Sequence, residues 1–180
     1  MAGPRIYAFV RAVRAAAPPP LPLFAAGFCW GGKWTALLCA PTLPAFLPPR
    51  PSASSAAPAP APAAARGEQP LLTAGFTAHP SGLSLPDDVA RVTRPLSVAN
   101  GTRDLQLTPA KMEQVRRILE DGGSGGGRRE GCELRVYEGM KHGFAVRGDP
   151  RDGAVKRAGE EAEDQAVAFF KRHAGGASRL

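Results

Sequence analysis

The sequence predicts an α/β protein in which a mostly parallel sheet of about four strands is flanked by helices. Short apolar runs alternate with segments of helical periodicity from the first residues to the last. This alternation is typical of a parallel sheet whose connections cross over its faces. Reactive side chains also follow several of the predicted strands, and ligands of such folds bind at the carboxyl ends of the strands.

The first forty residues predict a helix, a strand and a second helix. Residues 5–16 carry apolar side chains at the i, i+3, i+4 and i+7 spacing of an amphipathic helix, namely Ile6, Phe9, Val10 and Val13. The apolar run Pro22–Phe28 predicts a short strand, and Lys33–Ala40 reads as the start of a helix. Gly27 and Cys29 lie between them, so we expect a strand, a sharp turn and a helix.

The second half of the chain continues the alternation. Three further strands are predicted, over Leu71–Thr77, Pro95–Ala99 and Glu133–Tyr137. A helix opens at Thr108-Pro109, with threonine as N-cap and proline at the first helical position. Its apolar stripe consists of Met112, Val115, Ile118 and Leu119. The last helix is predicted over Glu160–His173, where alanine and phenylalanine side chains share one face.

Two segments contribute little to a hydrophobic core. Residues Pro41–Pro62 consist mainly of proline, alanine and serine, and Gly122–Gly127 is five glycines with one serine. Both compositions are typical of linkers or disordered insertions. The chain is therefore divided into residues 1–40 with the first helix and turn, a Pro/Ala-rich disordered insertion over 41–70, and the remaining α/β part over 71–175.

The charge and the hydropathy pattern exclude two classes of partner. The formal net charge is +7 and the pI is about 9.9, but the basic pairs are scattered and lie in no nucleic-acid-reading motif. A solvated basic surface is expected, without a nucleic-acid partner. The longest apolar candidate for a membrane span is interrupted by Pro18–Pro20 and Pro22, so no membrane association is expected.

The cysteines predict free thiols. Three cysteines form no CxxC pair and have no histidine at zinc-ligand spacing, which argues against a disulfide framework and against a metal site. A reducing compartment, the cytoplasm, fits best. The alternative is a mitochondrial location, because Met1–Arg66 has no acidic residue and carries several arginines. We favour an ordinary amphipathic helix over a transit peptide there.

Gly27-Phe28-Cys29-Trp30-Gly31 matches the nucleophile-elbow pattern, with cysteine in place of serine. Small neighbours are needed where the strand and the helix nearly touch, and the helix dipole favours the thiolate that attacks a carbonyl carbon. The Trp30 amide N–H is a candidate oxyanion-hole donor. One alternative is a buried cysteine in a glycine turn. Another is a phosphate-binding loop ending at Lys33, although Trp34 stands where Ser or Thr should hold Mg²⁺.

His142 and Asp104 complete a candidate triad. His142 follows a predicted strand and is flanked by glycine, which suits a general base, whereas a solvent-exposed loop histidine is the alternative. Asp104 follows the strand at Pro95–Ala99 and is a carboxylate able to orient the imidazole. Asp87 and Asp88 are less well placed and read as caps of a short helix. The order nucleophile, acid, histidine is that of α/β-hydrolases.

These segments together resemble the dienelactone hydrolase family in its eukaryotic, fungal-like form. The resemblance rests on Gly27–Lys33, Ala74–Pro80 and His142–Gly148. It implies a partial α/β-hydrolase fold and hydrolysis of dienelactones (carboxymethylenebutenolidase activity) or related small esters, with no metal or organic cofactor. It also implies that Cys29 attacks, His142 shuttles the proton and Asp104 orients the histidine. Arg147, one place beyond the arginine of bacterial members, is the candidate substrate-binding residue.

In this fold about four strands precede the nucleophile strand, whereas only one helix precedes it here. We therefore expect an N-terminally truncated member of the family, lacking the segment that supplies the second oxyanion donor. The sequence implies no particular oligomeric state. Two alternatives to the hydrolase are a catalytically inactive remnant or binding module of the same fold and, more distantly, nucleotide binding at Gly27–Lys33.

Overall fold

The computed structural model describes residues 2–18, 21–41, 70–120 and 129–175. Its centre is a four-stranded sheet in which the spatial order of the strands is their order along the chain. All three neighbouring pairs run parallel. The strands are β1 (Phe24–Phe28), β2 (Ala74–Ala78), β3 (Leu96–Arg103) and β4 (Glu133–Lys141). The predicted parallel sheet of about four strands is thus confirmed.

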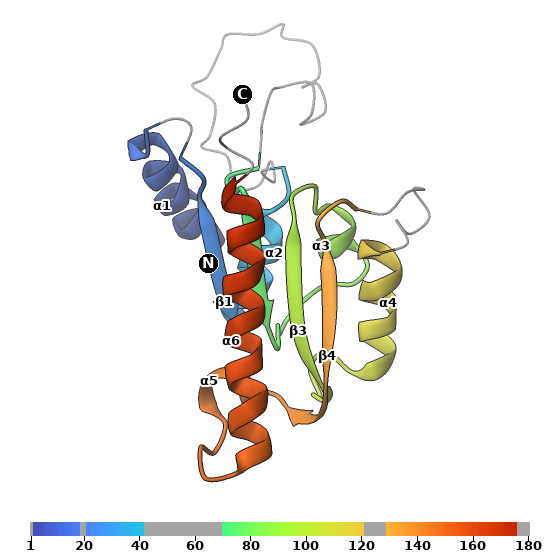
Figure 1. Cartoon of the computed structure of the whole chain (residues 1–180). Helices are drawn as coiled ribbons and strands as arrows, with labels where there is room; N and C mark the ends of the chain where they lie inside the picture. The colour runs from blue at the N-terminus through green and yellow to red at the C-terminus, as the bar shows by residue number, and fades with distance from the viewer. Residues whose placement is uncertain (1, 19–20, 42–69, 121–128, 176–180) are drawn as a thin grey trace, which may run out of the picture.

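Six helices are present in the described part of the chain and cover both faces of the sheet. They are α1 (Gly3–Ala16), α2 (Trp30–Leu38), α3 (Asp87–Ala90), α4 (Pro109–Leu119), α5 (Phe144–Arg147) and α6 (Gly153–Ala174). Figure 1 shows α6 crossing the near face of the sheet and α2 behind it. The connections between parallel strands therefore pass over the faces, as this topology requires.

Two hydrophobic clusters fill the space on the two faces. Alternate residues of a strand point to opposite faces, so Leu96 and Val98 join the cluster that also contains Tyr7 of α1 and Val115 of α4. Phe76, Ala78 and Ala99 join the other cluster, with Ala158 and Ala162 of α6. All five residues of β2 are buried, as expected for an inner strand of a parallel sheet.

The N-terminal helix is attached to the rest of the fold by side-chain hydrogen bonds. The buried Tyr7 hydroxyl donates to the Leu37 carbonyl at 2.9 Å, and the Arg14 guanidinium donates to the carbonyl oxygens of Leu71 and Leu21. These bonds hold α1 against α2 and against the segment that precedes β2. The helix predicted over residues 5–16 is confirmed, because α1 spans Gly3–Ala16.

Several predicted boundaries are wrong. The last helix begins at Gly153 and not at Glu160, because the Asp152 carboxylate caps it by accepting from two main-chain N–H groups. The second helix begins at Trp30 and not at Lys33, and β4 continues to Lys141. The predicted insertion over 41–70 and the glycine run at 122–127 lie almost wholly outside the described residues.

A close approach of main chains joins the ends of β3 and β4. A Cβ atom added at Gly101 of β3 would lie 2.0 Å from the carbonyl oxygen of Met140 in β4. The pairing register of the two strands shifts between Gly101 and Arg103. Only glycine therefore allows β4 to lie this close to β3. His142 follows β4 directly, so this approach helps to position it.

Replacing Gly101 with alanine is expected to destabilise the fold by about 2 to 3 kcal/mol, because the neighbour that must move is main chain. The matched control is Gly159→Ala in α6, where the added Cβ meets nothing closer than 3.5 Å. That change should raise stability by about 0.5 to 1 kcal/mol. Denaturant unfolding of both variants measures the difference, and equal effects of the two substitutions would contradict this account.

Candidate active site

Cys29 occupies a sharp turn between β1 and α2. Its main-chain angles are φ 53° and ψ −121°, an unfavourable region for a residue with a side chain. A Cβ atom at Gly27 would lie 2.2 Å from the Thr35 hydroxyl oxygen and 2.5 Å from the Gly31 carbonyl oxygen. Glycine is thus required where strand and helix touch, as the elbow pattern predicts, and the thiol lies at the N-terminus of α2.

Three main-chain hydrogen bonds hold this turn. The Cys29 N–H donates to the Ala78 carbonyl at 3.3 Å, and the Cys29 carbonyl accepts from the N–H groups of Gly32 and Ser81, each at 3.0 Å. Two of these partners belong to β2 and the turn that follows it. The strained conformation of Cys29 is therefore fixed by the neighbouring strand as well as by its own helix.

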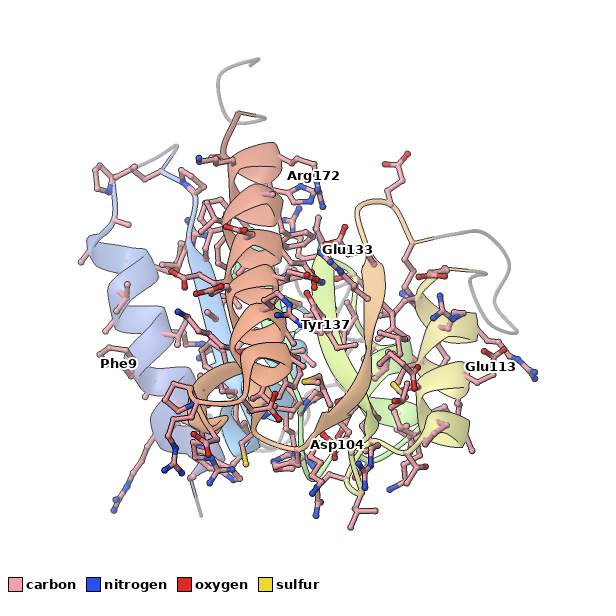
Figure 2. The ribbon with its side chains drawn as sticks, turned by 60° about the horizontal axis from the view of Figure 1, so that its bottom comes forward. Phe9, Asp104, Glu113, Glu133, Tyr137 and Arg172 are labelled. Carbon is pink, nitrogen blue, oxygen red and sulfur yellow. The ribbon has the colours of Figure 1, made fainter. Side chains whose placement is uncertain are left out.

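The structure brings Cys29, His142 and Asp104 together. His142 follows β4 directly, and its Nε2 atom lies 3.1 Å from the Cys29 sulfur. Its Nδ1 atom lies 2.9 Å from Oδ2 of Asp104, the residue that follows β3. Figure 2 places Asp104 at the edge of the sheet where the strands end. Cys29 and His142, which are 113 positions apart in sequence, thus form with Asp104 one continuous line of contacts from sulfur through imidazole to carboxylate.

The surroundings of Asp104 determine which imidazole nitrogen carries the proton. Asp104 is 1% exposed, and its Oδ1 accepts from the N–H groups of Gln106 at 2.7 Å and Leu107 at 3.3 Å. Within the described part of the chain, the second carboxylate oxygen has His142 as its hydrogen-bond partner. A carboxylate oxygen accepts, so Nδ1–H donates to it, which leaves the Nε2 lone pair directed at the sulfur.

The electrostatics favour an ion pair between sulfur and imidazole. Hydrogen bonds from His142 and then Ser81, and a smaller one from the Trp30 N–H, outweigh partial burial and lower the pKa of Cys29 to about 7. Burial lowers the pKa of His142, but its bonds to Cys29 and Asp104 outweigh burial, so that this pKa lies above its usual value. A thiolate beside an imidazolium is therefore accessible near neutral pH.

The other two cysteines differ from Cys29. Cys39 and Cys132 are buried, and burial raises the pKa of both thiols. Their sulfur atoms make only weak contacts, with the carbonyl oxygens of Pro95 and Arg94. All three cysteines are free, and Cys29 alone combines partial exposure with a lowered pKa.

Two residues at the site were not identified from the sequence. The fully buried His79 ring lies 5.0 Å from the His142 ring, edge to face, and the Ser81 hydroxyl lies 3.6 Å from the Cys29 sulfur. The available signal was the position of both residues at the carboxyl end of β2, the strand next to the nucleophile strand.

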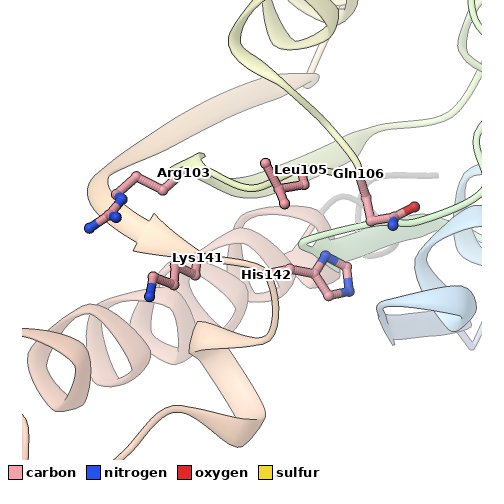
Figure 3. Close-up of a pocket in the computed structure, with 5 residues that line it drawn as sticks. All are labelled: Arg103, Leu105, Gln106, Lys141 and His142. Atoms are coloured by element: carbon pink, nitrogen blue, oxygen red, sulfur yellow. The ribbon is translucent and has the colours of Figure 1, made fainter.

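A cavity of about 640 Å³ opens beside the imidazole and is lined by Arg103, Leu105, Gln106, Lys141 and His142. Figure 3 shows the side chains of Arg103 and Lys141 extending to the same side of this cavity, away from the imidazole ring. Arg147 lines an adjoining cavity that also includes His142. Trp30 is 54% exposed, and it is the first residue of α2, so its main-chain N–H lies at the N-terminus of that helix.

The alternative of phosphate binding at Gly27–Lys33 finds little support. The Lys33 ammonium donates to the Gly82 carbonyl at 2.8 Å and pairs with Asp88 at 3.2 Å, so it is directed away from the loop.

Within the described residues, no cluster of His, Cys, Asp and Glu side chains is arranged to hold a metal ion. In the same residues, no helix combines the length and apolar character needed to cross a membrane.

Comparison with known proteins finds one matching family model and two hydrolases of similar sequence. The model of the dienelactone hydrolase family matches residues 60–174, which include Asp104 and His142 and begin after Cys29. Hydrolase tropI of Talaromyces stipitatus is 32% identical over 103 residues, and hydrolase pyvD of Aspergillus violaceofuscus is 28% identical over 102. Each alignment covers 57% of this chain, whereas the chain spans only 37% and 39% of those two proteins.

The solved structures that match confirm the fold. A Klebsiella pneumoniae protein of proposed dienelactone hydrolase function has a TM-score of 0.59 and 18% identity, covering 93% of this chain and 59% of that one. Esterase 2 of Thermogutta terrifontis has a TM-score of 0.58 and 18% identity, covering 89% and 61%. The predicted fold class, a mostly parallel sheet of the α/β-hydrolase type, is therefore correct for the described residues.

The environment of His79 predicts a pH dependence of stability. Burial, followed by the proximity of His142, lowers the pKa of His79 to about 4, whereas an unfolded histidine titrates near pH 6.5. As pH falls from 6.5 to 4, the unfolded chain binds a proton that folded His79 does not. His79 should therefore lower the free energy of unfolding by up to about 3 kcal/mol across this window.

His79→Asn should flatten the slope of unfolding free energy against pH between 6.5 and 4, since asparagine tolerates the positive φ of 40° and does not titrate. Denaturant unfolding at several pH values measures the slope. His173→Asn is the matched control, because His173 is only partly buried and its pKa is lowered less strongly. An unchanged slope in His79→Asn would contradict a buried neutral imidazole.

Proposed function

Since the chain belongs to the dienelactone hydrolase family, we propose that it hydrolyses small carboxylic esters or lactones, with Cys29 as nucleophile, His142 as general acid and base, and Asp104 as the residue that orients His142. The observation that carries this proposal is the continuous line of contacts from sulfur to carboxylate, 3.1 Å and then 2.9 Å. The proposed setting is a reducing compartment, because all three cysteines are free thiols. We propose the cytoplasm rather than the mitochondrion, because the N-terminal helix packs on α2 as part of the fold.

The first half of the proposed reaction forms a thioester. The Cys29 thiolate attacks the carbonyl carbon, and the carbonyl π electrons move to oxygen to give a tetrahedral intermediate. When the intermediate collapses, the bond to the alkoxide breaks and the imidazolium of His142 gives its Nε2 proton to the departing oxygen. Asp104 keeps the ring oriented and stabilises its protonated form throughout.

The second half releases the acid. Neutral His142 takes a proton from a water molecule, whose oxygen attacks the thioester carbonyl, and the carbon–sulfur bond breaks with the electron pair returning to Cys29. The Trp30 N–H, at the start of α2, is the proposed donor to the oxyanion in both halves. The dipole of α2 stabilises negative charge at the same place.

The cations around the cavities favour a substrate with an anionic group. Arg103 and Lys141 lie along the cavity beside His142, and Arg147 lines the adjoining one. The acidic residues of the adjoining cavity are already engaged, because Asp149 pairs with Arg151 and Asp152 caps α6. We therefore propose that Arg147 binds a carboxylate of the substrate.

Replacing Cys29 with alanine is expected to reduce the rate of hydrolysis of a small activated ester, 4-nitrophenyl acetate, by about 10³-fold or more. The reason is that the variant lacks the nucleophile of the proposed triad. Release of nitrophenolate measures the rate. The matched control is Cys132→Ala, which removes a thiol of raised pKa that lies in the core and should leave kcat unchanged.

Two other outcomes would be decisive. Turnover by Cys29→Ala within tenfold of the unaltered chain would contradict the proposed nucleophile. Absence of turnover in the unaltered chain, with a native unfolding transition, would instead support an inactive member of the family that acts as a binding module.

Arg147→Ala is expected to raise KM about three- to tenfold for an ester that carries a free carboxylate and to leave KM unchanged for its neutral methyl-ester analogue. The control is Arg117→Ala, because Arg117 is exposed on α4, pairs with Glu113 and lines neither cavity. Steady-state kinetics on the two substrates measures the selectivity. Equal effects on both substrates would show that Arg147 does not bind the carboxylate.

A further inference from the structure

The turn after β2 reaches the candidate nucleophile with two groups of the same residue. The Ser81 N–H donates to the Cys29 carbonyl at 3.0 Å. The Ser81 hydroxyl oxygen lies 3.6 Å from the Cys29 sulfur, within hydrogen-bonding range for sulfur. The main-chain bond fixes the position of Ser81 relative to Cys29. The hydroxyl is therefore held near the sulfur whether or not it is hydrogen-bonded to it.

The direction of the hydroxyl bond depends on the charge of the sulfur. A neutral thiol can donate to the hydroxyl oxygen or accept from it, whereas a thiolate can only accept. The hydroxyl therefore gains its strongest bond when Cys29 is ionised, since hydrogen bonds to a charged acceptor are about twice as strong as neutral ones.

We propose that Ser81 stabilises the Cys29 thiolate by donating its hydroxyl hydrogen to the sulfur, as a partner of the nucleophile separate from His142. This inference rests on the proposed function of Cys29. Within the described part of the chain, the Ser81 hydroxyl has the Cys29 sulfur as its hydrogen-bond partner.

Ser81 differs from His142 in a way that matters for the reaction. His142 loses its positive charge when it protonates the leaving group, and it is neutral when it activates water. A serine hydroxyl does not titrate in this pH range, so its donation persists in every step. It is therefore available when the carbon–sulfur bond of the thioester breaks and negative charge returns to the sulfur.

The test is the pH dependence of Cys29 alkylation by iodoacetamide, in which the thiolate forms a carbon–sulfur bond and iodide leaves. Ser81→Ala keeps the main-chain bond and removes only the hydroxyl. The midpoint of the rate profile, near pH 7 for the unaltered chain, is expected to rise by about one pH unit. Alkylation at pH 6 should then be several-fold slower, as measured by mass spectrometry of the Cys29 peptide.

The high-pH plateau gives a second signature that a merely structural role would not produce. A thiolate of higher pKa is the stronger nucleophile, so the plateau rate of Ser81→Ala should equal or exceed that of the unaltered chain. A loosened fold would instead expose Cys39 and Cys132, whose alkylation in the same sample reports on folding. Ser84→Ala, an exposed serine of the same loop, should leave the profile unchanged.

If Ser81→Ala exposes the buried cysteines, the comparison passes to Ser81→Thr and Ser81→Val, which have the same shape and differ in the hydroxyl. Threonine should keep the midpoint near pH 7 and valine should raise it. A midpoint for Ser81→Ala, or for valine against threonine, that moves by less than about 0.2 unit would overturn the proposal. Alkylation does not require ester turnover, so failure of the hydrolase proposal in the Cys29→Ala assay remains distinguishable.

Discussion

The strained main chain at Cys29 is the constraint on which the site depends. A residue with a side chain held at φ 53° costs on the order of 1 to 3 kcal/mol, and such a conformation persists only where its surroundings fix it. Here β1 fixes one side, the first turn of α2 the other, and the turn after β2 binds the Cys29 carbonyl. The turn also requires glycine at position 27, because the Cβ atom of any other residue would collide with Thr35. The thiol therefore projects from the carboxyl edge of the sheet in one direction.

The parallel topology brings the remaining partners to the same edge. Cys29 and His142 follow the two outermost strands, β1 and β4, which are separated by two others. Figure 1 shows the chain leaving β4 at the lower end of the sheet and running across to α5. His142 lies in this connection, directly after Lys141 of β4. The pairing register of β3 and β4 shifts between Gly101 and Arg103, and Gly101 lies against the main chain of Met140, just before Asp104 and His142 follow these strands. Asp104 follows β3, the neighbour of β4, and contacts Nδ1 of the imidazole, on the side of the ring opposite the nitrogen that faces Cys29.

The sequence predicts those parts of the fold and site that depend on local chemistry. Glycine at Gly27 and Gly31, apolar runs, and polar residues directly after strands are all visible in one dimension, and they placed Cys29, Asp104 and His142 correctly relative to the strand ends. His79 and Ser81 also follow a predicted strand, but their contacts with His142 and Cys29 could not be predicted, because these depend on β2 lying next to β1. The start of α6 was set too late, since residues 153–159 have few apolar side chains and are held by the Asp152 cap.

The two neighbouring histidines, His142 and His79, show how position alone separates the proposed base from a structural residue. Their rings lie 5.0 Å apart, yet their pKa values move in opposite directions. His142 faces Asp104 on one side and the sulfur on the other, and these partners favour its protonated form. Neither ring nitrogen of His79 meets a hydrogen-bond partner within the described part of the chain, and burial keeps it neutral. A second imidazolium at that distance would repel the first and weaken the ion pair with Cys29. An uncharged His79 therefore supports the ring of His142 without competing for its proton.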